Sequence, residues 1–210
     1  MNNQIFFNYQ FSEKNDQENF FVNKSNEDAY KTITDNYFDQ NIFLYGPEKS
    51  GKSHLLNIWK KNNQAIIFEN NFNEIINSNK NIAIDEILIK HSQEELFHII
   101  NHSKAHNLKI LVTSSFDLNY DKNILKDLLS RLKSFYNVKI NSPNEEMCKI
   151  IMTKLFYEKQ IIIKNKEIFN FIFNRVHRTY SDIYSIVQKI DKLSLEKKKQ
   201  LTIPLIREIL

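Results

Sequence analysis

The segment "IFLYGPEKSGKSHLLNIW", residues 42–59, joins a short apolar run, a glycine-bounded loop and a helical pattern. Its centre, "GPEKSGKS" (46–53), contains the only two glycines of the 210-residue chain, Gly46 and Gly51. At an average content of about 7%, a protein of this length would carry about fifteen glycines. The retention of both in one loop indicates a backbone geometry that other residues adopt only with strain.

The loop fits the phosphate-loop pattern G-x-x-x-x-G-K-[ST] and lies between a predicted strand and a predicted helix, which is the context that the motif requires. In such a loop the backbone N–H groups turn towards phosphate oxygens. The pattern predicts that Lys52 contacts the β- and γ-phosphates and that the Ser53 hydroxyl binds Mg²⁺. A chance match on a glycine turn is the alternative. The candidate nucleotide-binding residues here are Gly46, Pro47, Glu48, Lys49, Ser50, Gly51, Lys52, Ser53 and His54.

Two later segments place polar residues at the ends of apolar runs. "NIAIDE" (81–86) predicts that Asp85 holds Mg²⁺, directly or through water, and that Glu86 polarises an attacking water. "LVTSS" (111–115) places Ser115, our candidate for a γ-phosphate contact, at the end of the next strand. Ordinary exposed strand ends and turns explain these residues as well.

Composition narrows the class of protein. The net charge of +4 and the pI of about 8.9 permit contact with nucleic acid but do not argue for it. Cys148 is the only cysteine, so neither a disulfide framework nor a cysteine metal site is expected. No apolar run approaches the roughly 20 residues that cross a bilayer, and the N-terminus lacks the pattern of a secretion signal. We expect a cytoplasmic protein without a membrane partner.

The order of elements predicts two parts. Strands are expected at 41–45, 65–68, 81–85, 108–114 and 137–140, alternating with helical patterns, which is typical of a parallel α/β sheet. From Pro143 the chain has four helical patterns and no strand, at 144–159, 166–176, 181–195 and 202–210. We place the boundary near Ser142.

These segments, with "LLSRL", "SPNEEMCKIIMTKL" and "LTIPLIREIL", resemble the AAA+ module of the bacterial replication initiator DnaA from about Phe20 to Leu210. Because no helix-turn-helix domain follows "IREIL", the chain is more similar to the shorter Hda-type relatives. The resemblance implies a P-loop AAA+ core (20–142) with a five-stranded parallel sheet in the order 5-1-4-3-2. A helical lid (143–210) follows, and residues 1–19 form an N-terminal segment. It also implies bound ATP or ADP with Mg²⁺, and no direct sequence-specific binding of DNA.

The resemblance further implies partners. Hda-type proteins, docked on the DNA sliding clamp, stimulate ATP hydrolysis by the initiator DnaA. Arg131 in "SRL" falls at the family's arginine finger, which acts in trans on the nucleotide of a neighbouring AAA+ protein. "QIFFNY" (4–9) is similar to the clamp-binding peptide near the start of Hda, with Gln4, Ile5 and Phe7 as anchors. The alternatives are a solvated helix-surface arginine and an aromatic N-terminus without a partner.

Some residues depart from the family pattern. Ser181 stands where the lid arginine belongs, and Arg178, three residues earlier, is the candidate to replace it at the nucleotide. Ser115 stands where the initiator usually has Asp. These departures predict a weak or partner-dependent ATPase at most. "FFVNKSNEDA" resembles the segment lining the adenine pocket, with Phe21 and Val22 as its wall, although an N-capped helix explains it almost as well.

Three functions stay open at this point. The first is a nucleotide-binding regulator that acts on the initiator while it is docked on the clamp. The second is an oligomeric AAA+ ATPase of the helicase-loader kind, acting on DNA as a homo-oligomer. The third is an adaptor that holds ADP without hydrolysis. A small-molecule kinase is disfavoured because the helical part follows the core instead of interrupting it.

Overall fold

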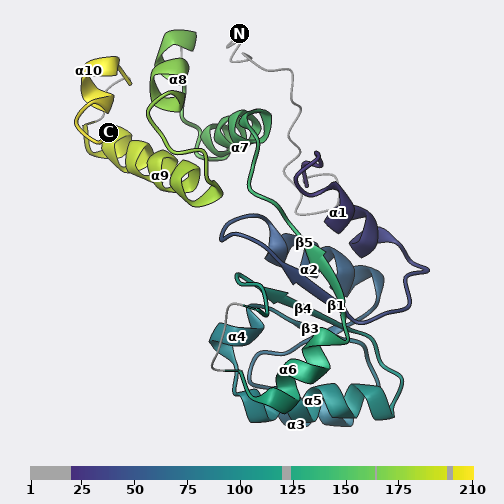
Figure 1. The fold of residues 1–210 in the computed structure, drawn as a ribbon. Helices are drawn as coiled ribbons and strands as arrows, with labels where there is room; N and C mark the ends of the chain where they lie inside the picture. Colours follow the sequence, from purple (N-terminus) through teal and green to yellow (C-terminus); the bar gives the residue numbers. More distant parts are fainter. Residues whose placement is uncertain (1–19, 120–123, 164, 198–200) are drawn as a thin grey trace. The chain divides into compact units, whose positions relative to one another are not determined.

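A computed structural model describes residues 20–119, 124–163, 165–197 and 201–210 (Figure 1). The chain divides into two compact units. One of them ends at Asn141, and the other contains Ser142–Leu210.

The first unit is built on a parallel sheet of five strands. Its order is β2-β3-β4-β1-β5, which confirms the order expected from the resemblance. The strands are β1 (Ile42–Tyr45), β2 (Ile66–Ile67), β3 (Ile82–Ile84), β4 (Ile110–Ser114) and β5 (Tyr136–Lys139). All five run in the same direction, so their carboxyl ends share one edge of the sheet, where ligands bind in folds of this kind.

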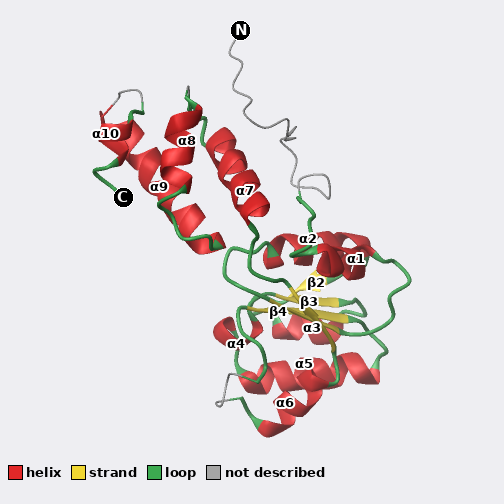
Figure 2. Cartoon of the chain, turned by 45° about the horizontal axis from the view of Figure 1, so that its top comes forward, coloured by secondary structure: helices red, strands yellow, loops and turns green. Residues whose placement is uncertain are grey.

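Helices cover both faces of this sheet. They are α1 (Glu27–Thr34), α2 (Lys52–Asn62), α3 (Phe72–Asn77), α4 (Ile87–Lys90), α5 (Gln93–Ala105) and α6 (Lys126–Lys133). Figure 2 shows α1 and α2 on one face and α3, α5 and α6 on the other. This three-layer arrangement follows from the alternation of strands and helices along the chain.

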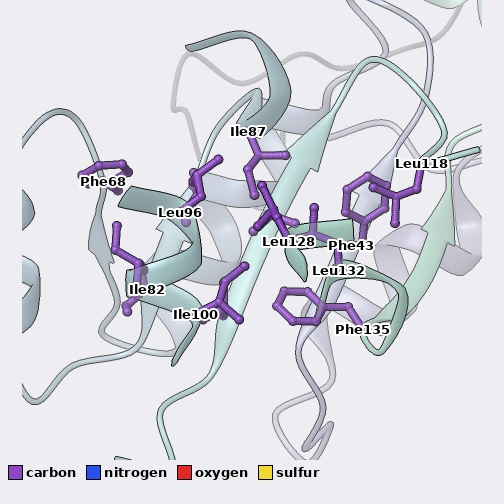
Figure 3. Packing of buried hydrophobic residues seen from close by; sticks show 14 of the residues in the cluster. Phe43, Phe68, Ile82, Ile87, Leu96, Ile100, Leu118, Leu128, Leu132 and Phe135 are labelled. Carbon is purple, nitrogen blue, oxygen red and sulfur yellow. The ribbon is translucent and has the colours of Figure 1, made fainter. Parts of the chain in front are cut away.

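The strand side chains alternate between the two faces, as a two-residue period requires. Phe43 points into a cluster with residues of α5 and α6, including Leu96 and Leu128 (Figure 3). Its neighbours Ile42 and Leu44 enter a second cluster with residues of α1 and α2. Each fully buried apolar side chain contributes about 1.5–3 kcal/mol relative to exposure. The two apolar faces therefore fix the register of β1 and, with it, the position of the loop that follows.

Two short helices were not expected from the sequence. α3 has six residues and is anchored by Ile75, which is fully buried. α4 has four residues and begins after Glu86, whose backbone is left-handed with φ 50°. Helices of one or two turns show too few repeats for a hydrophobic period to be visible in the sequence.

The described residues of the second unit form helices joined by loops, with no strand among them. It contains α7 (Glu145–Glu158), α8 (Lys166–Phe173), α9 (Tyr180–Lys197) and α10 (Ile203–Ile206). Its apolar core includes Phe169, Ile172 and Ile190. Asn144 caps α7, because its side chain accepts a hydrogen bond from Met147 N at 2.8 Å.

The last helical pattern, expected over 202–210, is shorter in the structure. After α10 the chain continues through i→i+3 bonds, in which Glu208 N donates to Leu205 O and Ile209 N to Ile206 O. This tightened turn is common where a helix ends.

Candidate nucleotide-binding site

The loop 46–53 connects the carboxyl end of β1 to the first turn of α2, and both glycines are sterically required in it. A Cβ on Gly46 would lie 2.7 Å from Ile140 O, closer than real Cβ atoms approach a carbonyl oxygen. Gly51 has φ +96° and packs against the Phe20 ring, which a Cβ would meet at 2.9 Å. The structure therefore explains why glycine is retained here: one position is crowded by the backbone, and the other needs a left-handed conformation.

Lys52 lies buried under this loop. Its Nζ donates to the carbonyl oxygens of Gly46 and Pro47, each at 3.1 Å, and to Ser115 Oγ at 3.2 Å. It also forms an ion pair with Glu86 at 3.2 Å. A lysine that is 4% exposed needs such partners, since an unpaired buried ammonium is costly. The ammonium group is thus held at the carboxyl edge of the sheet, beside the predicted phosphate-binding backbone.

Ser53 and Asp85 lie together at the same edge. Ser53 Oγ donates to both carboxylate oxygens of Asp85, at 3.0 and 3.1 Å. Thr113 Oγ1 donates to Asp85 Oδ1 at 2.7 Å, and Lys90 Nζ lies 2.9 Å from Oδ2. Burial acts to raise the pKa of the Asp85 carboxyl, but these hydrogen bonds outweigh it and lower the pKa below its ordinary value. Asp85 is therefore ionised at neutral pH.

Glu86 is held differently from Asp85. Ser115 donates to its carboxylate through both the backbone N–H, at 3.0 Å, and the hydroxyl, at 2.9 Å. With the ion pair to Lys52, three donor groups fix the Glu86 carboxylate, and the left-handed backbone at this residue aims it towards β4. The sequence places Glu86 and Ser115 in separate roles, whereas the structure joins them directly.

Residues near Phe21 and Val22 form a structured turn before α1. The Asn26 side chain fixes this turn, since Asn23 N donates to its Oδ1 at 2.8 Å and its Nδ2 donates to Phe21 O at 2.9 Å. Asn26 is also the residue that precedes α1, although its side chain caps no helical N–H. The Phe21 carbonyl is thus already bonded, while Val22 is half-buried.

An aromatic cluster beside Gly51 was missed from the sequence. Phe20 stacks on Tyr30 with ring centroids 5.7 Å apart, and meets His54 edge-on at 5.4 Å. His54 follows Ser53 in the first turn of α2. Phe20 opens the segment "FFVNKSNEDA", but no pattern in the sequence places its ring against His54.

Other loop residues lie at the surface or turn inward. Glu48 and Lys49 are exposed, and Lys49 has a left-handed φ of 61°. Ser50 is buried, and among the described residues no hydrogen-bond partner reaches its Oγ. A buried hydroxyl of this kind is rare in a folded protein and points to a ligand or water at the loop.

A cavity of about 420 Å³ adjoins Ser53 and Asp85. Its wall also contains Glu69, Lys90 and His91. The His91 ring packs on Phe68 at 4.7 Å, and its Nε2 lies 3.2 Å from Asp85 O. Burial lowers the pKa of His91, and the hydrogen bond to the backbone opposes this only in part. Lys90 and His91 were not identified from the sequence because α4, which carries them to this edge, was not expected.

Arg131 lies in α6, a helix that follows β4 in the chain and contributes none of the site residues described above. Its guanidinium is 5.7 Å from the centroid of the Phe97 ring, a cation–π distance. A cavity of about 360 Å³ beside it is lined by Phe97, Lys104, Asp127, Ser130, Arg131 and Ser134. Within the described ranges no carboxylate is close enough to Arg131 to form an ion pair.

The remaining candidate residues belong to other parts of the chain. In the second unit, Arg178 pairs with Glu145 at 3.0 Å and lies 5.4 Å from the Phe173 ring. Ser181 is exposed near the start of α9. The clamp-binding candidates Gln4, Ile5 and Phe7 lie outside the described residues.

Comparison with known proteins agrees with this architecture. The family model described as "Hda, lid domain" matches residues 158–210. The chromosomal replication initiator protein DnaA of Buchnera aphidicola subsp. Cinara cedri (strain Cc) is 30% identical over the whole of this chain and 55% of its own length. The chain spans about half the length of the curated initiators that it matches.

Solved structures show the same fold. Domain III of the Thermotoga maritima replication initiation protein DnaA superposes with a TM-score of 0.74 and 21% identity, over 96% of this chain and 98% of that one. AMPPCP-bound DnaA from Aquifex aeolicus gives a TM-score of 0.67 and 20% identity, over 90% of this chain and 69% of that one.

None of the helices in the described part of the chain has the length and apolar character needed to cross a bilayer.

The five-stranded parallel sheet and the phosphate-loop sequence at its carboxyl edge define the class: a P-loop AAA+ core, followed here by a helical unit. The lid match and the DnaA relatives narrow this class further. Together they show that the chain is similar to DnaA in its AAA+ fold and, over residues 158–210, to the lid of Hda-type proteins.

Proposed function

We propose that this chain binds ATP or ADP at the loop 46–53 and regulates the initiation of chromosome replication by acting on the AAA+ domain of DnaA. The observation that carries the proposal is that one chain contains both a phosphate loop with bonded Lys52 and Ser53 side chains and a segment, residues 158–210, that matches the Hda lid model. Lys52 contacts the phosphates, and the turn at Phe21 and Val22 with the Phe20 cluster flanks the base. The structure of AMPPCP-bound DnaA supports a nucleotide ligand for this fold.

The donor set at the sheet edge fits Mg²⁺. Ser53 supplies a hydroxyl and Asp85 an ionised carboxylate, both of them oxygen ligands of the kind that Mg²⁺ prefers. In the described ranges no three His, Cys, Asp or Glu side chains gather to hold a metal by themselves. Mg²⁺ would therefore be shared with nucleotide phosphates, where it neutralises their charge, as is usual for this ion.

The hydrogen bonds and the ion pair of the Glu86 carboxylate are the reason to propose that this chain hydrolyses ATP slowly. A residue that polarises an attacking water needs a free carboxylate oxygen. Ser115 and Lys52 engage Glu86 through three donor groups, and these must loosen before Glu86 can act as a base. This observation also favours the third function considered above, an adaptor that holds ADP without hydrolysing ATP.

Arg131 is the residue proposed to act on the partner. An arginine finger stabilises the charge that spreads over the γ-phosphate oxygens of a nucleotide held by another protein. Phe97 restricts the guanidinium through the cation–π contact, so less entropy is lost when it engages that nucleotide. Arg178 in the lid is a candidate contact for this chain's own nucleotide.

Clamp docking is assigned to the N-terminal segment. Gln4 offers an amide for hydrogen bonds, while Ile5 and Phe7 offer apolar groups for a pocket, a combination suited to a short extended peptide. This segment would concentrate the regulator where replication is under way. A homo-oligomer that works on DNA as a helicase loader remains the alternative arrangement.

The experiment is an ATPase assay of the initiator with clamp-loaded DNA, in the presence and absence of this protein. We expect hydrolysis of initiator-bound ATP to rise when both clamp and protein are present. Replacing Gln4 and Phe7 by Ala should remove the stimulation and leave nucleotide binding by this chain unchanged. Fast hydrolysis by this protein alone, with no effect on the initiator, would favour the loader function instead.

A further inference from the structure

Lys90 is placed by the shortest helix of the first unit. α4 starts directly after Glu86 and is anchored by Ile87, which is fully buried. Lys90 N donates to Glu86 O at 3.1 Å, so a single helical turn separates the acidic pair from the lysine. This turn brings the Lys90 side chain back towards Asp85, the residue that follows β3.

The Lys90 ammonium meets Asp85 at 2.9 Å from Oδ2. Ser53 and Thr113 also donate to this carboxylate, but both are neutral hydroxyls. Lys90 therefore supplies the positive charge that balances Asp85. Any cation held by Asp85 must use the same two carboxylate oxygens.

Mg²⁺ and the ammonium carry charge of the same sign and cannot share these oxygens without strong repulsion. Lys90 is 53% exposed, so it has a path into solvent. Glu69 lines the same cavity and offers a second anion to the displaced ammonium. The ion pair is thus weak enough to be broken and close enough to compete.

Resting on the nucleotide-binding function proposed above, we propose that Lys90 is a built-in counter-ion that competes with Mg²⁺ for Asp85. It raises the Mg²⁺ concentration at which nucleotide binding responds to the metal, and it retains Asp85 in a paired state when the metal is absent. Lys90 acts on metal binding only through its ion pair with Asp85 and is not itself a metal ligand.

The test measures the affinity of the full chain for fluorescent N-methylanthraniloyl-ADP while the Mg²⁺ concentration is varied. Lys90→Met removes the charge and retains an unbranched side chain of similar shape. Lys90→Arg retains the charge, and Lys80→Ala, at an exposed loop position before β3, is the control for net charge. Circular dichroism of each variant establishes that it is folded.

We expect the Mg²⁺ concentration at half-effect to fall about two- to fivefold in Lys90→Met, which corresponds to an exposed ion pair of up to about 1 kcal/mol. Lys90→Arg and Lys80→Ala should match the wild type. An unchanged midpoint in Lys90→Met, or an equal shift in Lys80→Ala, would overturn the role of Lys90 while leaving nucleotide binding in place. If the wild type bound no ADP at any Mg²⁺ concentration, the proposed function itself would fail.

Discussion

The two units of the chain differ in where they place their charged side chains. In the first unit, ionisable side chains at the carboxyl edge of the sheet are interlinked, and Lys52 is buried among them. In the second unit the interior is apolar, and charges such as Arg178 and Glu145 pair at the surface. Exposed ion pairs contribute little, with a median near 0–1 kcal/mol. The comparison separates a unit built around a charged site from one whose stability depends on packing.

Among the variants that concern this chain alone, the largest effect is expected from packing in the second unit. Ile172 is fully buried between helices, so Ile172→Ala should lower the free energy of unfolding by about 2–5 kcal/mol. Ile162→Ala removes the same atoms from a position that is 51% exposed and should change it far less. Urea denaturation of both variants measures the difference. Equal effects would mean that the packed core does not dominate this unit.

The next effect concerns the charged site. Lys52→Ala removes a buried ammonium, and we expect the affinity for ADP to fall about 100-fold, because a charged hydrogen bond contributes up to about 3 kcal/mol. Lys60→Ala, in the last turn of the same helix, is the matched control. Fluorescent nucleotide titration gives both affinities. Unchanged binding by Lys52→Ala would remove the phosphate-loop assignment.

A smaller effect is expected from the glycine at the end of β1. Gly46→Ala places a Cβ against Ile140 O and should cost about 1–3 kcal/mol of stability through local strain. Ser50→Ala, in the same loop, removes a buried hydroxyl that has no partner among the described residues and should be nearly neutral. Thermal unfolding of the two variants compares them. A neutral Gly46→Ala would show that the loop tolerates a side chain there.

The smallest effect is a dependence on pH. Burial holds the pKa of His91 below its unfolded value of about 6.5, so protonation favours the unfolded chain. The stabilising contribution is complete above the unfolded pKa and declines as pH falls below it. Unfolding measured between pH 7.5 and 5.5 should show a shallower decline in His91→Gln than in the wild type. His98→Gln provides the comparison. An identical slope of stability against pH in all three proteins would exclude His91 as a source of this pH dependence.

The sequence was most informative where strong patterns coincide. The strands and the loop 46–53 follow from apolar runs, from their alternation with helical patterns and from the two glycines in one loop, whereas the sheet order was expected only from the resemblance to the DnaA family. α3 and α4 could not be predicted, since one or two turns leave no period. Lys90 and His91 were missed for the same reason. The bond from Ser115 to Glu86 depends on the left-handed backbone at Glu86, which no local pattern in the sequence specifies.

The central claim is that Arg131 acts on the nucleotide of the initiator. Its most direct test is single-turnover hydrolysis of initiator-bound ATP on clamp-loaded DNA, comparing wild type, Arg131→Ala and Lys133→Ala, an exposed lysine two residues further along α6. An arginine finger contributes about 10³- to 10⁵-fold to such a rate. We therefore expect Arg131→Ala to lose the stimulation and to bind ADP as tightly as the wild type, with Lys133→Ala unaffected. Full stimulation by Arg131→Ala would contradict the account.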